Sequence, residues 1–152
     1  MGGEEAIQIL VADDDLEDCM LLKEAWQDFL LINNLSFVHN GEELLDYLHK
    51  RGEYKDAPRP DLILLDLNMP KKDGREALIE IKADSALKSI PIVVLTTSSA
   101  EEDINKTYQR GISGFITKPV TFDGLVAVLR TLKKYWVEIV KLPPNGDRQQ
   151  LK

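Results

Sequence analysis

Five polar residues have side chains and positions suited to joint chemistry. They are the adjacent pair Asp13 and Asp14, and the single residues Asp66, Thr96 and Lys118. Carboxylates that lie close together raise one another's pKa, so a cluster of them favours a bound cation. Because no His or Cys belongs to this set, the oxygen donors favour a hard ion, Mg²⁺ before Ca²⁺.

A cation, a lysine, a hydroxyl and an aspartate are the parts that a phosphoryl acceptor requires. An aspartate can be the nucleophile and form a covalent phosphorylated intermediate. The cation, Lys118 and Thr96 can neutralise and position the phosphoryl oxygens. The residue types therefore indicate phosphoryl transfer to an aspartate.

Short apolar strands that alternate with helices are expected to position these residues. The strands are predicted at 7–12, 35–38, 62–66, 92–95 and 114–117. Apolar spacing predicts helices from 16 to about 32, around 44–48 and 77–81, from 101 to the residue before Gly111, and from 122 onward, with a loop at 51–60. This alternation predicts a parallel sheet with helices on both faces. All its strands end on one edge, so that the polar residues meet there.

Bulk composition agrees with one globular domain. The chain has 152 residues, of which 43% are hydrophobic and 30% charged. A formal net charge of -7 argues against nucleic acid as the main partner. The single cysteine excludes an internal disulfide framework, and the acidic start lacks the features of a signal peptide. No apolar run approaches the roughly 20 residues of a membrane helix, so we expect a cytoplasmic protein with no membrane partner.

Four motifs in this order resemble the receiver domain of two-component response regulators, over roughly residues 7–133. They are the acidic pair after the first strand, Asp66 before Leu-Asn-Met-Pro, Thr96 after the fourth strand, and Lys118-Pro119. The resemblance implies an α/β, flavodoxin-like (βα)5 fold. Its doubly wound parallel five-stranded sheet would have strand order 2-1-3-4-5, with an extended C-terminal helix. We expect the receiver domain to span 1–142 and a disordered tail to span 143–152.

The resemblance also implies the role of each site residue. Asp66 would accept a phosphoryl group from a histidine kinase. Asp14 and Asp66 would ligate Mg²⁺ with the backbone carbonyl of Asn68, and Asp13 would assist through water. Thr96 and Lys118 would bind the phosphoryl oxygens.

Further family positions imply a cis peptide bond, a switch and two tuning residues. The bond before Pro119 is expected to be cis. The switch would join Thr96 to Phe115, where many receivers have a tyrosine. Asn68 and Ser98 would tune the lifetime of the acyl phosphate.

A narrower resemblance is to the single-domain regulators of bacterial and cyanobacterial phytochromes. It rests on the stretch 66–76, on Leu-Thr-Thr-Ser at 95–98 and on Ile-Thr-Lys-Pro-Val at 116–120. It implies a phytochrome-type histidine kinase as partner, and output through contacts with a downstream protein or through phosphorelay. The apolar residues Trp136, Ile139, Val140 and Leu142 extend past the expected body of the domain, and packing back on the domain is one alternative for them. We expect instead a homodimer contact in which the stripe of Leu132, Trp136 and Ile139 meets the same stripe of a second copy.

Three other functions fit the residues less well. An aspartate-dependent phosphatase needs a second Asp two residues after the nucleophile, where this chain has Asn68. A nucleotide- or flavin-binding domain needs a Gly-rich or hydroxyl-rich loop after the first strand, where this chain has three carboxylates. A phosphorylation-independent adaptor would lack a site residue. We therefore expect a signalling protein that catalyses only its own phosphorylation and dephosphorylation.

Overall fold

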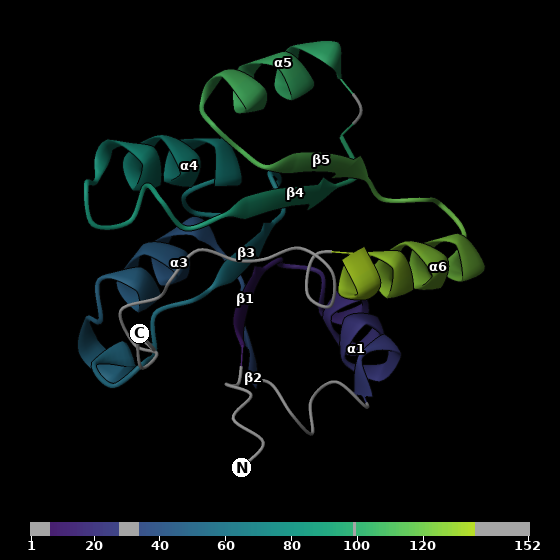
Figure 1. The fold of residues 1–152 in the computed structure, drawn as a ribbon, viewed down its shortest axis with the longest axis horizontal. Helices are drawn as coiled ribbons and strands as arrows, with labels where there is room; N and C mark the ends of the chain where they lie inside the picture. Colours follow the sequence, from purple (N-terminus) through teal and green to yellow (C-terminus); the bar gives the residue numbers. More distant parts are fainter. Residues whose placement is uncertain (1–6, 28–33, 99, 136–152) are drawn as a thin grey trace, which may run out of the picture.

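Five parallel strands form one sheet in the part of the chain that the structure describes. The computed structural model describes residues 7–27, 34–98 and 100–135. The sheet order is β2-β1-β3-β4-β5, as Figure 1 shows. The strands are β1 (Gln8–Ala12), β2 (Asn34–Val38), β3 (Leu62–Leu65), β4 (Ile92–Thr96) and β5 (Gly114–Thr117). The predicted flavodoxin-like fold and its strand order are confirmed.

Helices cover both faces of this sheet. They are α1 (Leu16–Ala25), α3 (Gly41–Leu48), α4 (Gly74–Ala83), α5 (Glu101–Gln109) and α6 (Phe122–Leu132), with a 3₁₀ turn η1 (Gly52–Tyr54). The helices α1 and α6 lie on one side of the sheet, and α3 and α4 lie on the other (Figure 1). Each side has its own apolar core. None of the helices in the described ranges is long and apolar enough to cross a membrane.

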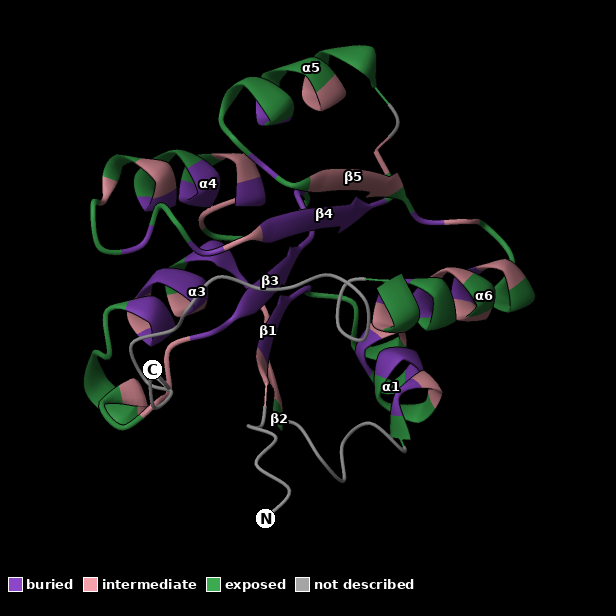
Figure 2. Ribbon diagram, in the orientation of Figure 1, coloured by how far each residue is buried: buried purple, intermediate pink, exposed green. Residues whose placement is uncertain are grey.

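Alternation along the strands explains why there are two cores. In β3, Leu62 and Leu64 pack in the core with α1 and α6, whereas Ile63 and Leu65 pack in the core with α3 and α4. The strand is buried on both faces, as expected for a continuous apolar run in a parallel sheet. Figure 2 shows β1, β3 and β4 buried along most of their length, and β5 less so. The central strands therefore provide a rigid base for the loops at their ends.

Side-chain caps fix where two site-bordering helices begin. Asp15 accepts hydrogen bonds from the backbone N–H groups of Glu17 and Asp18 and caps α1. Asp73 and Glu76 form a reciprocal capping box at the start of α4. Both helices therefore begin immediately after a loop that carries acidic residues.

Helix α1 is shorter than the predicted helix from 16 to about 32. It ends at Ala25, and Trp26 forms its C-cap. The indole Nε1 of Trp26 donates to the backbone oxygen of Leu129 at 2.7 Å and joins α1 to α6. The rest of the predicted helix falls mostly on residues 28–33, outside the described residues. The predicted loop at 51–60 contains the short turn η1.

Two site predictions are wrong. Leu132 is only 3% exposed and packs with Leu125 and Leu129 in the core, because the leucine stripe of α6 faces the sheet and α1. It does not offer its side chain to a second copy of the chain. The Lys118–Pro119 peptide bond is trans, which is the intrinsically favoured isomer before proline.

Several other predictions fall outside the described residues. Trp136 and Ile139, which were expected at the same dimer contact as Leu132, are among them. So are the extension of the last helix beyond residue 135 and the tail at 143–152.

Candidate functional site

The carboxyl ends of the strands bring the polar residues to one edge of the sheet. Backbone hydrogen bonds extend the strand ladder into the site. The N–H of Asp66 donates to the oxygen of Ala12 at 2.9 Å, and the N–H of Lys118 donates to the oxygen of Thr96 at 2.7 Å. The peptide groups of Asp66, Thr96 and Lys118 are therefore held as firmly as those of the strands.

Both oxygens of the Asp66 carboxylate have hydrogen-bond donors. Oδ1 accepts from the Thr96 hydroxyl at 2.7 Å and from the Asn68 backbone N–H at 3.1 Å. Oδ2 lies 3.2 Å from the Lys118 ammonium group. Asp66 and Thr96 are both buried. This buried carboxylate is thus oriented by a hydroxyl, a backbone amide and a cation.

Lys118 is the buried cation of the site, with a side chain that is 4% exposed. Its Nζ contacts Asp66, Asp13 at 2.7 Å and Asp18 at 2.7 Å. Burial by itself would lower the pKa of Lys118, but the attraction of Asp13 and the other carboxylates outweighs burial and raises that pKa. The lysine therefore stays charged at neutral pH.

Three carboxylates at this edge form a group that fits a metal ion. Oxygens of Asp13, Asp14 and Asp66 all lie within 4.8 Å of one another. Burial raises the pKa of Asp13 to about 6, although Lys118 opposes the shift. A cation bound by these oxygens would offset the free-energy cost of burying the carboxylate charge. The donor set therefore suits a hard divalent ion.

Gly74 permits the turn after Asp66 to close tightly. Its N–H donates to the oxygen of Leu67 at 2.8 Å. A Cβ at Gly74 would lie 2.3 Å from the backbone oxygen of Asp66. Only glycine fits between the start of α4 and the backbone of the central carboxylate.

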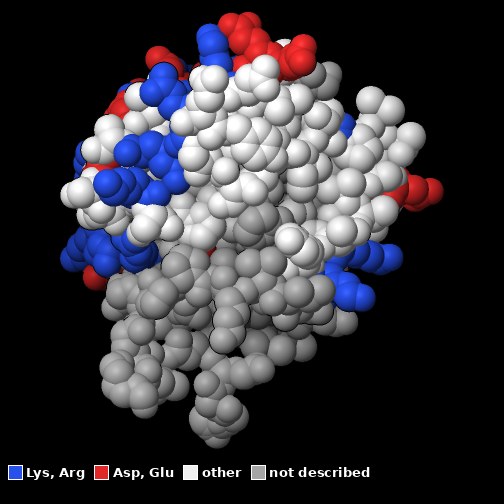
Figure 3. Space-filling view, turned by 45° about the horizontal axis from the view of Figure 1, so that its top comes forward, with Lys and Arg blue, Asp and Glu red and all other residues white. Residues whose placement is uncertain are grey.

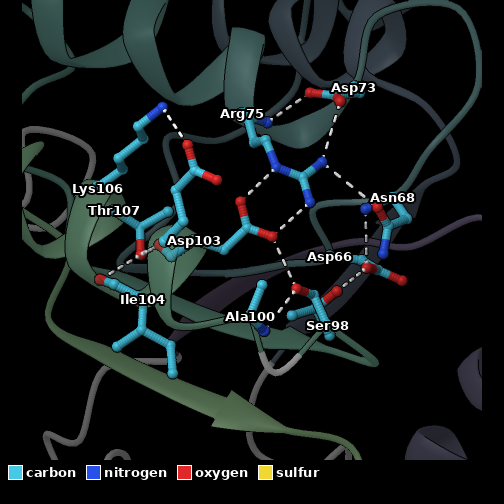
Figure 4. A network of polar contacts seen from close by, with 12 residues as sticks. Asp66, Asn68, Asp73, Arg75, Ser98, Ala100, Asp103, Ile104, Lys106 and Thr107 are labelled. Carbon is cyan, nitrogen blue, oxygen red and sulfur yellow. Dashed lines mark hydrogen bonds and ion pairs between the residues drawn. The ribbon is translucent and has the colours of Figure 1, made fainter.

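A second polar network borders the site and joins α4 to α5 (Figure 4). Arg75 donates from Nε to Asp103 Oδ1 at 2.8 Å and from Nη2 to Asp103 Oδ2 at 2.7 Å. Its Nη1 donates to Asn68 and to Asp73. Ser98 donates from its hydroxyl to Asp103 at 2.7 Å. Asn68, two residues after Asp66, and Ser98, two residues after Thr96, are thus connected through the Arg75–Asp103 ion pair.

Sequence reasoning missed three residues of these networks. They are Asp18, Arg75 and Asp103, none of which the motifs single out. Sequence spacing alone does not reveal their partners, since Asp18 and Lys118 are 100 residues apart. Phe115 is half-buried on β5 and packs against the core on the α3 and α4 side.

Comparison with known proteins gives one family match and three similar proteins or structures. A family model described as the response regulator receiver domain matches residues 9–130. The response regulator Rcp1 of a Synechocystis species is 40% identical over 135 residues, which are 89% of this chain and 92% of Rcp1. The crystal structure of the phosphorylated cyanobacterial phytochrome response regulator RcpA has a TM-score of 0.87 at 41% identity, and the match covers 91% of this chain and 99% of that one. The Mn²⁺-bound structure of Rcp1 also has a TM-score of 0.87, at 39% identity and the same coverage.

Proposed function

The chain belongs to the response regulator receiver domain family, and from this premise we propose that it is a single-domain response regulator of a two-component system. The receiver domain is a signalling module. The observation that carries the proposal is the buried Asp66 carboxylate, which Thr96 and Lys118 contact from two sides. Asp66 is the phosphoryl acceptor in this proposal.

The reaction is a transfer from a phosphorylated histidine. An oxygen of Asp66 attacks phosphorus, the P–N bond breaks, and the imidazole leaves with the electron pair. Lys118 balances charge on the phosphoryl oxygens. The Thr96 hydroxyl, which now donates to Asp66, turns to a phosphoryl oxygen. The protein thereby catalyses only its own phosphorylation and the later hydrolysis of the acyl phosphate.

Asp13, Asp14, Asp66 and the backbone carbonyl of Asn68 would hold a divalent ion. We assign this ion as Mg²⁺ because all the donors are oxygens. When bound, Mg²⁺ supplies positive charge to the phosphoryl group. The short distances among the three carboxylates, and the Mn²⁺ bound to the related Rcp1, support this assignment.

Reorientation of the Thr96 side chain is expected to move Phe115 on β5. Thr96 and Thr117 are paired in the register of β4 and β5, and Phe115 is two residues before Thr117. When Thr96 turns toward a phosphoryl group, Phe115 moves inward from its half-buried position. Identical Phe115 rotamers in the free and phosphorylated protein would contradict this switch.

The partner is a histidine kinase, and the close relatives favour a phytochrome-type kinase. Large apolar side chains are exposed on two segments that the Lys118–Asp18 contact joins: Leu16 and Met20 on α1, and Val120 and Phe122 after β5. Such a group of exposed apolar residues beside the site favours a protein as the phosphoryl donor.

Output passes to a downstream protein or along a phosphorelay, in the cytoplasm and without nucleic acid or membrane contact. The chain acts as a homodimer with Trp136 and Ile139 at the contact.

Mass spectrometry of the intact chain tests the central proposal. With Mg²⁺ and acetyl phosphate, the wild type gains the mass of one phosphoryl group and Asp66→Asn gains none. Asp46→Asn is the matched control, since Asp46 is an exposed aspartate paired with Arg51 away from the site. A wild type that gains no phosphoryl group would overturn the proposal.

A further inference from the structure

The Arg75–Asp103 ion pair connects the two loops that border Asp66. Arg75 lies in the first turn of α4 and Asp103 in the first turn of α5. The two parallel hydrogen bonds between them have the fork geometry that makes arginine–carboxylate pairs strong and directional. The Asp103 side chain is only 16% exposed. The pair is therefore better ordered than an ordinary surface ion pair.

Arg75 determines which end of the Asn68 amide faces the ion pair. Its Nη1 lies 3.3 Å from Asn68 Oδ1. A guanidinium group can only donate, so it selects the oxygen of the amide and turns the NH₂ group away. The backbone N–H of Asn68 bonds to Asp66, which places this residue at the rim of the acceptor. Asn68 thus presents a donor to its remaining surroundings.

Asp103 fixes the hydroxyl of Ser98 as a hydrogen-bond donor to the ion pair, whereas Arg75 fixes Asn68 as an acceptor. The carboxylate can only accept, and Ser98 donates its single hydroxyl proton to Oδ2 at 2.7 Å. The Ser98 oxygen then has only lone pairs left, one of which faces the N–H of Ala100 at 3.4 Å. The hydrogen bond from Arg75, with further help from Ser98, lowers the pKa of Asp103 to about 2, so the carboxylate stays ionised at neutral pH.

We propose that Arg75 and Asp103 are positioning residues that set the lifetime of the acyl phosphate by fixing the orientation of Asn68 and Ser98. The inference rests on the proposed function of Asp66. In hydrolysis, a water oxygen attacks phosphorus, the P–O bond to Asp66 breaks, the carboxylate leaves with the electron pair, and the water proton passes to solvent.

Attack in line with the leaving oxygen brings the water from the side opposite Asp66. The loops that carry Asn68 and Ser98 border the acceptor, since the Asn68 N–H and the Thr96 hydroxyl both donate to Asp66 Oδ1, and we expect the water to pass these loops. The ion pair holds these loops together and holds both side chains in one hydrogen-bonded arrangement. Water entry is thereby restricted, and the acyl phosphate persists.

Decay of the acyl phosphate after removal of acetyl phosphate tests the proposal. We expect Arg75→Ala and Asp103→Ala each to shorten the half-life about threefold or more, and the double variant to decay no faster than either single variant. Asp103→Asn keeps the shape of the side chain and should also shorten the half-life. Glu102→Gln is the matched control, because it removes a neighbouring carboxylate of α5 that pairs with exposed Lys106.

Two double-mutant cycles distinguish a positioning role from a general loss of structure. If Asp103 acts through Ser98, Asp103→Ala should have little effect in a Ser98→Ala background. Likewise, Arg75→Ala should have a smaller effect in an Asn68→Ala background than in the wild type, because only its contact with Asp103 remains to be lost. Half-lives equal to that of the wild type, or an acceleration that is undiminished in these backgrounds, would overturn the inference. Failure of the wild type to take up phosphate is a different result, which overturns the proposed function and this inference with it.

Discussion

At the scale of single residues, Asp18 determines how Lys118 is shared. The ammonium group has contacts of 2.7 Å to Asp13 and to Asp18, and a longer contact of 3.2 Å to Asp66. Asp18 therefore draws the lysine toward α1 and limits its contact with the acceptor. We infer that Asp18 orients Lys118 for the incoming phosphoryl group.

Replacing Asp18 by alanine should slow phosphorylation by acetyl phosphate about tenfold. That corresponds to about 1.4 kcal/mol, which is close to the value of one charge-assisted hydrogen bond. The reaction can be followed by intact mass over time. Glu17→Gln is the control, because Glu17 is also an acidic residue in the first turn of α1. Equal rates for Asp18→Ala and Glu17→Gln would contradict a role in orienting Lys118.

The pKa of Asp13 predicts how metal binding depends on pH. Burial raises this pKa to about 6, so protons compete with a cation up to that pH. A raised carboxyl pKa also means that this group's contribution to folding stability decreases as pH rises from about 4 to about 6. Mg²⁺ affinity should have the opposite trend and be about fourfold weaker at pH 5.5 than at pH 7.5.

Calorimetric Mg²⁺ titrations of the free protein at the two pH values check this expectation. Asp13→Asn should bind Mg²⁺ more weakly and should lose most of the pH dependence over this range. If the variant keeps the full pH dependence, another group is responsible for it.

At the scale of elements, the strands could be predicted from the sequence, but the side-chain contacts between helices could not. Apolar runs that end in a polar residue show where each parallel strand leaves the core, so Asp66, Thr96 and Lys118 could be placed on one edge. Arg75 and Asp103 lie on two helices and are 28 residues apart, and helical periodicity says nothing about how such helices meet. The same limit explains Leu132, whose place in an apolar stripe does not say whether the stripe faces the sheet or a second chain.

Helix α1 and the segment after β5 together are expected to bind the kinase. Phe122 is 64% exposed and Met20 is 62% exposed, although both are large and apolar. Phe122→Asp should slow transfer from a phosphorylated phytochrome-type histidine kinase about tenfold or more, the loss expected when a central apolar contact is removed. Uptake from acetyl phosphate should be unchanged, because that small donor needs no docking surface.

The control for this variant is Ile79→Asp, which places the same charge on an exposed apolar position of α4. It should reduce neither reaction. A Phe122→Asp chain that loses both reactions equally would show damage to the site and would contradict a docking role.

At the scale of the whole molecule, charge limits how two copies can meet. Each chain has a formal net charge of -7, so two copies repel one another at low salt. Figure 3 shows a face with a broad uncharged area between groups of Lys and Arg. Beside β5 and α6 there is a hollow of about 370 Å³, and its lining includes Ile116, Val128 and Tyr135. An uncharged contact would bring few like charges together.

The proposed homodimer should therefore become tighter as salt screens the repulsion between copies. Trp136 and Ile139 follow Leu132 at helical spacing, and Leu132 is the last residue of the described core. Trp136→Asp and Ile139→Asp should lower the sedimentation coefficient to that of a monomer and leave uptake from acetyl phosphate unchanged, because neither residue belongs to the site. Lys134→Ala changes an exposed polar residue nearby and should sediment as the wild type does. A wild type that sediments as a monomer at every salt concentration would contradict the dimer, and variants that remain dimeric would place the contact elsewhere.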